Sequence, residues 1–283
     1  MRFRELWLAL TLVATCVLLL VWLGSGGWPG APHPCIALGD CYCEAPRAGL
    51  VAQPANTWSA VPGTLLHLWL AWHVGWIRRR GEPPLPLNPM GSTRFFPALY
   101  ALIVVFPAAT FFHASLTDWG GKVDIAQMYL FSDFWIAYNL TRLYDLSRAR
   151  FLALYLAATA LLLIPRLGFS ALGIDIFVVL VGGVIFTELM IAFPKAFRWL
   201  GSRRELTVRH GWLWAALALY VPALAVWQLA GQSGTRFCDP QSLLQGHALW
   251  HVLTAINPVL IYFYFLKGDR TGLRDTEERL RRL

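Results

Sequence analysis

Long apolar stretches alternate with short polar loops along most of the chain, and this alternation predicts its fold. Several stretches approach the length of about 20 residues that an α-helix needs to cross the hydrocarbon core of a bilayer. We therefore predict an all-α polytopic membrane protein, in which a bundle of seven transmembrane helices follows an additional N-terminal helix. The eight predicted spans cover residues 6–24, 55–77, 95–116, 124–143, 151–167, 172–194, 211–230 and 246–266.

The positions of the basic residues support this count and orient the chain. Of the 24 Lys and Arg residues, all but four fall on one side of the membrane if the chain crosses it eight times. The four on the other side are Arg47, Lys122, Arg166 and Arg236. The positive-inside rule then places both termini in the cytoplasm. Because the basic residues lie in loops beside apolar spans, the net charge of +8 does not indicate a nucleic-acid-binding surface.

The predicted spans divide the chain into four regions. Residues 1–25 form a signal anchor, 26–54 an extracytoplasmic segment with cysteines, 55–267 the seven-helix domain and 268–283 a cytoplasmic tail. A cleaved signal peptide is the alternative for the first region, but its apolar run is long and no clear small-x-small cleavage site follows. The short loops favour a bacterial inner membrane, whereas a eukaryotic secretory membrane is the alternative.

Four of the five cysteines fall on the non-cytoplasmic side of this topology. They are Cys35, Cys41, Cys43 and Cys238. Four thiols in an oxidising compartment suggest two disulfides, with three possible pairings. Pairing Cys43 with Cys238 would tie the N-terminal segment to the loop before the last span and leave Cys35 for Cys41. A metal site at Cys41-x-Cys43 is the alternative.

Three histidines form a candidate metal site near the non-cytoplasmic side. His247 and His251 are four residues apart, so they lie on one face of the last span, one turn from each other. His113 ends an earlier span at the same predicted depth. Three histidines with an open position are the ligand set of a catalytic zinc ion. Asp124 opens the next helix at this level, where it would align or deprotonate a water, or hydrogen-bond a ligand histidine.

Other polar residues within the predicted spans have simpler interpretations. His67 and His73 are expected to be hydrogen-bonded core residues rather than ligands. Asp133, Asp175 and Glu188 are expected to be packed polar partners of neighbouring helices.

Three blocks of the sequence resemble the alkaline ceramidases and their bacterial relatives. The blocks are DCYCEAPRAGLVAQPANTWSA, FFHASLTDWGGKVDIAQM and HALWHVLTAI, between residues 40 and 266. The family has an Asp eleven residues after the first His, and His113 and Asp124 keep that spacing. The family belongs to a superfamily of seven-helix metal hydrolases that also contains the adiponectin and progestin receptors.

The resemblance implies an intramembrane zinc-dependent amidase. Its substrate would be ceramide or a related lipid amide, cleaved to a sphingoid base and a fatty acid. Asp124 would hold the attacking water, and Cys43 would pair with Cys238. The implied zinc ligands are His113, His247 and His251.

The chain also departs from the family pattern. The family usually has a Ser four residues before the first His, where this chain has Ala109, so Thr110 or Ser115 would have to stabilise the oxyanion. The family's calcium site is matched by Glu44, while Asp40 is displaced by one position and Gln53 replaces a Glu. Calcium prefers several charged oxygen ligands, so this site is expected to be weakened.

The histidines and the predicted fold are also compatible with two other functions. A membrane haem protein would take axial ligands from histidines on different helices, such as His67 and His113. A non-catalytic lipid sensor or receptor would share the fold without the chemistry, because fold does not fix function.

Overall fold

The structure, a computed structural model, describes residues 3–39, 41–77, 88–163, 176–201 and 206–269. Its regular structure is almost entirely helical, which confirms the predicted all-α class. The chain divides into two compact units built from segments that are distant in sequence. Unit 1 comprises Met1–Glu82, Ala101–Gln127 and Gly211–Phe263, and unit 2 comprises Pro83–Tyr100, Met128–His210 and Tyr264–Leu283. Asp40, Asp175 and most of the predicted tail lie outside the described residues.

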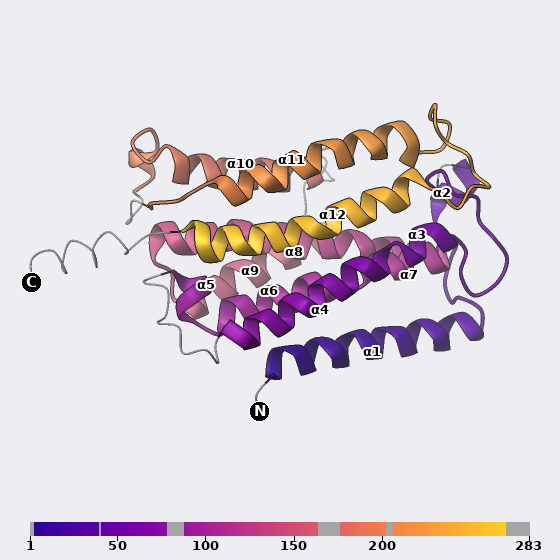
Figure 1. The fold of residues 1–283 in the computed structure, drawn as a ribbon, viewed down its shortest axis with the longest axis horizontal. Coiled ribbons are helices and arrows are strands. Elements are labelled where there is room, and N and C mark those ends of the chain that lie inside the picture. Colours follow the sequence, from indigo (N-terminus) through magenta and orange to yellow (C-terminus); the bar gives the residue numbers. More distant parts are fainter. Residues whose placement is uncertain (1–2, 40, 78–87, 164–175, 202–205, 270–283) are drawn as a thin grey trace, which may run out of the picture. The chain divides into compact units, whose positions relative to one another are not determined.

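Four long helices form a row in unit 1. They are α1 (Arg4–Ser25), α4 (Ala60–Ile77), α12 (Gly246–Phe263) and α11 (Gly211–Val226). Helix α1 packs on α4, α4 on α12, and α12 on α11, as the ribbon shows (Figure 1). A small residue allows α4 and α12 to approach closely, since a Cβ added at Gly63 would lie 2.7 Å from the Cβ of Ala255.

Shorter helices complete unit 1 at one end of this row. Helices α2 (Pro34–Leu38), η3 (Trp227–Gly231) and α3 (Pro54–Trp58) belong to it, and α3 packs on α7 (Ala108–Ser115). Pro107 separates α7 from α6 (Phe95–Val105) because proline lacks a backbone N–H and cannot continue the helical ladder. The Gln127 amide on α8 (Asp118–Tyr144) donates to the carbonyls of Ile103 and Phe106 beside this break.

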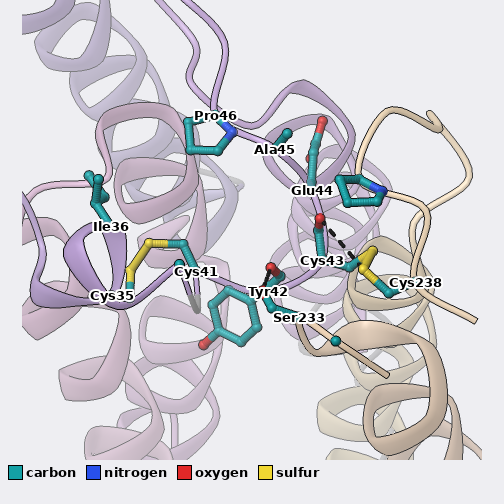
Figure 2. A pocket seen from close by; sticks show the side chains of 13 residues that line it. Cys35, Ile36, Cys41, Tyr42, Cys43, Glu44, Ala45, Pro46, Ser233 and Cys238 are labelled. Carbon is teal, nitrogen blue, oxygen red and sulfur yellow. Dashed lines mark hydrogen bonds between the residues drawn. A yellow bond between two sulfur atoms is a disulfide. The ribbon is translucent and has the colours of Figure 1, made fainter. Parts of the chain in front are cut away.

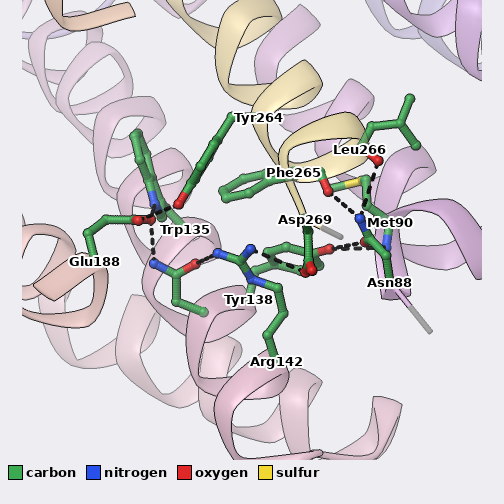
Figure 3. A network of polar contacts seen from close by, with 11 residues as sticks. Asn88, Met90, Trp135, Tyr138, Arg142, Glu188, Tyr264, Phe265, Leu266 and Asp269 are labelled. Carbon is green, nitrogen blue, oxygen red and sulfur yellow. Dashed lines mark hydrogen bonds and ion pairs between the residues drawn. The ribbon is translucent and has the colours of Figure 1, made fainter. Parts of the chain in front are cut away.

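Unit 2 contains the rest of α6 and α8, together with α5 (Pro89–Ser92), α9 (Arg148–Leu163), α10 (Ile176–Ala192), η2 (Arg198–Leu200) and η4 (Tyr264–Gly268). A buried polar network lies at its centre (Figure 3). Arg142 forms an ion pair with Asp269 at 3.3 Å, and both side chains are almost fully buried. The Tyr138 hydroxyl donates to Asn88, which in turn donates to the Phe265 carbonyl.

The number of membrane spans differs from the prediction. Among the described residues, four helices are long and apolar enough to cross a membrane, not eight: Arg4–Ser25, Phe95–Ser115, Gly211–Gly231 and Gly246–Gly268. The predicted spans at 55–77 and 124–143 are helical, but α4 carries two histidines and α8 carries five charged residues, which lower their hydropathy. Helices α9 and α10 have only 16 and 17 residues. The count of seven spans after the first helix was therefore wrong by these criteria.

Candidate metal centre

His113 lies in the last turn of α7, where several local features fix the end of the helix. Leu116 adopts a left-handed conformation with φ 49° and caps the helix through its N–H, which donates to the Phe112 carbonyl. The Thr117 hydroxyl accepts a hydrogen bond from the Gly120 N–H and starts α8. The short connection between α7 and α8 therefore holds the His113 side chain in a defined position in the interior.

The other two histidines lie in the first turns of α12. Their spacing of four residues places both imidazoles on one face of the helix. Gly246, the residue before His247, packs against the backbone of Ala230. A Cβ added at Gly246 would lie only 2.5 Å from the Ala230 carbonyl carbon. This close approach fixes the start of α12 and therefore the position of His247.

The three histidines converge in unit 1, as the sequence predicted. Each offers one ligand nitrogen, and these nitrogens lie within 4.8 Å of one another. The Nε2 atoms of His113 and His247 are 3.2 Å apart. The ring centroids are separated by 4.9 Å for His113 and His247, 4.9 Å for His113 and His251, and 4.4 Å for His247 and His251. His113 and His247 are buried and His251 is half-buried, so these polar groups face one another largely away from solvent.

The second nitrogen of two of these rings is bound to the protein. His113 Nδ1 lies 2.7 Å from Gln53 Oε1. His251 Nδ1 lies 3.1 Å from the Asn56 carbonyl and 2.9 Å from the Ser59 hydroxyl, which itself donates to that carbonyl. Metal-binding histidines usually donate their other ring N–H to such acceptors, which fixes the tautomer and the ring orientation. His247 Nδ1 is buried and has no hydrogen-bond partner among the described residues.

The spacing of His113 and His247 fits two ligands of one metal ion, and the ligand nitrogen of His251 lies beside them. A tetrahedral zinc ion with Zn–N bonds of about 2.0–2.1 Å separates two ligand nitrogens by about 3.3 Å, close to the 3.2 Å between His113 and His247. Neutral imidazoles suit zinc and other first-row transition metals rather than calcium or magnesium. Without a cation, the convergence of their ring nitrogens would leave buried lone pairs poorly satisfied.

No protein-family model matches the chain, and no curated protein sequence matches it significantly. The metal centre is therefore supported by the geometry of the three histidines. The resemblance to the alkaline ceramidases stays a prediction.

Both disulfides lie beside the triad in unit 1. Cys35 is bonded to Cys41, and Cys43 to Cys238, which confirms two disulfides and excludes a thiolate metal site at Cys41-x-Cys43. A cavity of about 340 Å³ is lined by both disulfides and by Tyr42 and Ser233 (Figure 2). These covalent links hold the segment around Tyr42 in place beside the cavity.

Tyr42 lies between this cavity and the histidines. Its ring stacks on His247 with a centroid distance of 3.7 Å, and it lies 5.3 Å from the ring of His113. Its backbone φ of 63° is uncommon for a residue other than glycine, and its carbonyl accepts a hydrogen bond from the Ser233 hydroxyl. Tyr42 therefore covers the side of the triad that faces the cavity.

The predicted catalytic side chains are less closely associated with the triad. Asp124 lies half-buried on α8. Among the described residues, its carboxylate is not part of the group of potential metal ligands formed by His113, His247 and His251. Thr110 is half-buried on α7, three residues before His113. The Ser115 hydroxyl donates to the Phe111 carbonyl at 2.7 Å and contacts the Thr117 hydroxyl at 2.8 Å. Ser115 is thus engaged in the turn between α7 and α8, which argues against its predicted role at an oxyanion.

The calcium site implied by the resemblance stays a prediction. The Glu44 carboxylate accepts hydrogen bonds from the backbone N–H groups of Ala55 and Asn56 at the start of α3. The Gln53 amide nitrogen donates to the carbonyls of Cys41 and Glu44. Both side chains are therefore already satisfied by the protein, and a calcium ion would have to displace these hydrogen bonds.

The arrangement disfavours the haem alternative. The Nε2 atoms of His113 and His247, at 3.2 Å, are too close to accommodate a porphyrin between them. His67 Nε2 instead lies 2.9 Å from the Ala255 carbonyl, as expected for a hydrogen-bonded core residue.

Three residues near the triad were not predicted from the sequence: Tyr42, Asn56 and Ser59. Asn56 and Ser59 lie at the end of the first sequence block, DCYCEAPRAGLVAQPANTWSA, for which no role at the triad was predicted. Their contact with His251 depends on how α3 packs against α12, which no local pattern reports.

Proposed function

We propose that this protein is an integral membrane, zinc-dependent hydrolase that cleaves the amide bond of ceramide or a related lipid amide. The products would be a sphingoid base and a fatty acid. The observation that carries the proposal is the buried convergence of His113, His247 and His251, with two rings anchored through Nδ1. The three sequence blocks that resemble the alkaline ceramidases supply the substrate class.

The surface of the long helices supports a location in the bilayer. Helix α1 exposes large apolar side chains, among them Trp7 and Trp22 at 63% and 69%. Only 11% of the residues in the apolar windows of α1 and Gly211–Gly231 are buried. Apolar surface of this extent is expected to contact lipid, where a ceramide-like substrate would reside.

The disulfides support a metal centre on the non-cytoplasmic side. Disulfides persist in oxidising compartments such as the bacterial periplasm or a secretory lumen. Cys41 and Cys43 flank Tyr42, whose ring stacks on His247. If the chain crosses the membrane eight times, the distribution of Lys and Arg indicates cytoplasmic termini and a site on the periplasmic side of a bacterial inner membrane.

The chemistry follows from the residues of the site. When bound, a zinc ion would lower the pKa of a coordinated water and polarise the amide carbonyl. Asp124 would accept the proton of the attacking water and deliver it to the leaving amine. Thr110 would offer its hydroxyl to the developing oxyanion. Tyr42 would exclude bulk water from the side of the triad that faces the cavity.

Hydrolysis of a fluorescent ceramide by the detergent-purified protein tests this proposal. The Asp124→Asn variant is expected to lose activity by about 10²–10⁴-fold while it retains zinc. The His113→Ala variant is expected to lose both. The control is Asp118→Asn, because Asp118 is an exposed carboxylate on the same helix that pairs with Lys122.

Undiminished hydrolysis in both Asp124→Asn and His113→Ala would contradict the proposal. The second candidate is a non-catalytic sensor on the same fold, which the engagement of the Ser115 hydroxyl in a turn favours. Stoichiometric zinc without turnover on a panel of lipid amides would support that candidate instead.

A further inference from the structure

Gln53 connects the disulfide-linked segment to the metal centre. Its side chain is fully buried at the start of α3. Its backbone N–H donates to the His113 carbonyl at 2.9 Å, and the N–H of Ala52 donates to the Ala114 carbonyl at 2.9 Å. The chain before α3 therefore pairs with the end of α7, and the Gln53 side chain is held against His113 by the backbone of both residues.

The orientation of the Gln53 amide follows from its partners. Its Nε2 atom lies 2.6 Å from the Cys41 carbonyl oxygen and 2.6 Å from the Glu44 carbonyl oxygen. Carbonyl oxygens only accept hydrogen bonds, so the atom between them must be the NH₂ group, which donates two. The reversed amide would place three oxygens together, and the usual ambiguity between nitrogen and oxygen in glutamine is removed.

This orientation determines the tautomer of His113. The Oε1 atom of Gln53 faces His113 Nδ1 at 2.7 Å and can only accept a hydrogen bond. The proton of the neutral imidazole must therefore lie on Nδ1. The lone pair then lies on Nε2, the atom that faces His247 Nε2 at 3.2 Å.

The two carbonyls that hold Gln53 are themselves fixed. The segment from Cys41 to Glu44 is held by the disulfides Cys35–Cys41 and Cys43–Cys238 and by a hydrogen bond from the Cys43 N–H to the Gly231 carbonyl. The Glu44 carboxylate also bonds two N–H groups at the start of α3. The hydrogen bonds run in one direction: the His113 Nδ1–H donates to Gln53 Oε1, and the Gln53 NH₂ group donates to the carbonyls of Cys41 and Glu44.

We propose that Gln53 is a positioning residue of the metal centre, which holds the His113 proton on Nδ1 and so presents Nε2 to the metal. The carbonyls of Cys41 and Glu44 orient Gln53, and the disulfide-linked segment thus forms the outer layer of the site. This inference rests on the proposed metal centre but not on the identity of the substrate.

Zinc affinity of the purified full-length protein tests the inference. Metal-free protein is titrated with Zn²⁺ in competition with a chromophoric chelator. The Gln53→Met variant keeps the size of the side chain but removes its acceptor and donors, and we expect it to bind zinc about 10- to 100-fold more weakly. Its Co²⁺ complex is expected to show an altered d–d absorption spectrum, because the His113 ring is no longer oriented.

The matched control is Gln127→Met. The Gln127 amide also donates to backbone carbonyls, those of Ile103 and Phe106 in unit 1, but makes no hydrogen bond to a histidine of the triad. Its loss is expected to lower stability without a change in zinc affinity. Equal zinc affinities for wild type and Gln53→Met would overturn the inference, as would equal losses in the two variants.

A measurement on the wild type keeps the inference testable if Gln53→Met does not fold. Imidazole ¹⁵N chemical shifts of metal-free protein report which nitrogen carries the proton, and His113→Ala identifies the signal. We expect protonation of Nδ1 in His113, and protonation of Nε2 would overturn the inference. Failure of the metal centre itself would appear differently, as absence of zinc binding in the wild type.

Discussion

The two compact units each bury a cluster of polar groups, and the clusters differ in how their hydrogen bonds are satisfied. In unit 2, the charge of Arg142 is paired with Asp269, and Arg142 also donates to the Asn139 side chain. The Glu188 carboxylate accepts three hydrogen bonds, at 2.6–2.8 Å, from Trp135, Asn139 and Tyr264. Arg142 Nε has no hydrogen-bond partner in the part of the chain that the structure describes. Most of the other polar groups of this cluster are satisfied by one another.

The triad in unit 1 has the opposite character. Gln53 and the Asn56 carbonyl anchor the outer nitrogens of His113 and His251, but the inner nitrogens face one another. A buried polar network is stable when every member is satisfied, whereas converging lone pairs need a cation or another donor. In the unit 2 cluster, most polar groups already have a hydrogen-bond or ion-pair partner, as expected for a structural network. In the unit 1 cluster, the inner nitrogens of the histidines face one another instead, and this cluster is therefore the candidate site.

Removal of Arg142 should give the largest effect on stability. Arg142→Met removes the buried ion pair with Asp269, and we expect a loss of about 3–5 kcal/mol in the free energy of unfolding. Thermal unfolding in detergent measures the loss. The double variant Arg142→Met/Asp269→Leu should recover much of it, because neither charge of the buried pair remains. The zinc content of the folded protein should be unchanged in both variants. Loss of zinc would contradict the view that the unit 2 cluster stabilises the fold without contributing to the metal site.

A methyl group at Gly246 should disturb the triad through packing. Because its Cβ would lie 2.5 Å from the Ala230 backbone, Gly246→Ala must displace the start of α12 together with His247. We expect destabilisation by about 1–3 kcal/mol and weaker zinc binding, measured by chelator competition.

The control for this variant is Gly182→Ala on α10, where an added Cβ meets nothing within 4 Å. There the better helix propensity of alanine should leave stability unchanged or raise it by up to about 1 kcal/mol. Unaltered zinc affinity in Gly246→Ala would mean that the start of α12 adjusts without moving His247.

The smallest effect is expected for Ser115→Ala. Its hydroxyl bonds the Phe111 carbonyl and Thr117, so its loss should cost about 1 kcal/mol of stability and leave hydrolysis unchanged. A fall in the hydrolysis rate of about 10²-fold or more would instead assign Ser115 to the oxyanion.

The sequence predicted the histidine cluster from a topology in which one helix ends and another begins on the same side, which places His113 and His247 at one depth. The structure brings the two rings together, with their Nε2 atoms 3.2 Å apart. The spacing of His247 and His251 then follows from the helical repeat. The pairing of Cys43 with Cys238, implied by the resemblance, is also present.

The rest depends on tertiary contacts that no local pattern reports. The contacts of Gln53 with His113 and of Ser59 with His251 require α3 to pack beside α7 and α12. The stacking of Tyr42 on His247 requires a left-handed backbone conformation at Tyr42. The predicted number of spans was wrong because every apolar stretch near 20 residues was counted as a span. Helix α8 is an example: it carries charged residues that lower its hydropathy, and one of them, Arg142, is buried in an ion pair with Asp269.

The central claim is tested most directly by the metal content of the purified protein, measured by mass spectrometry in a folded sample never exposed to chelator. We expect about one zinc ion per wild-type chain and almost none in His247→Ala. His67→Gln is the control, because His67 is a buried histidine of the same unit that bonds the Ala255 carbonyl instead of joining the triad, and it should retain zinc. A folded wild-type protein without zinc or another transition metal would contradict the account and leave the three histidines structural.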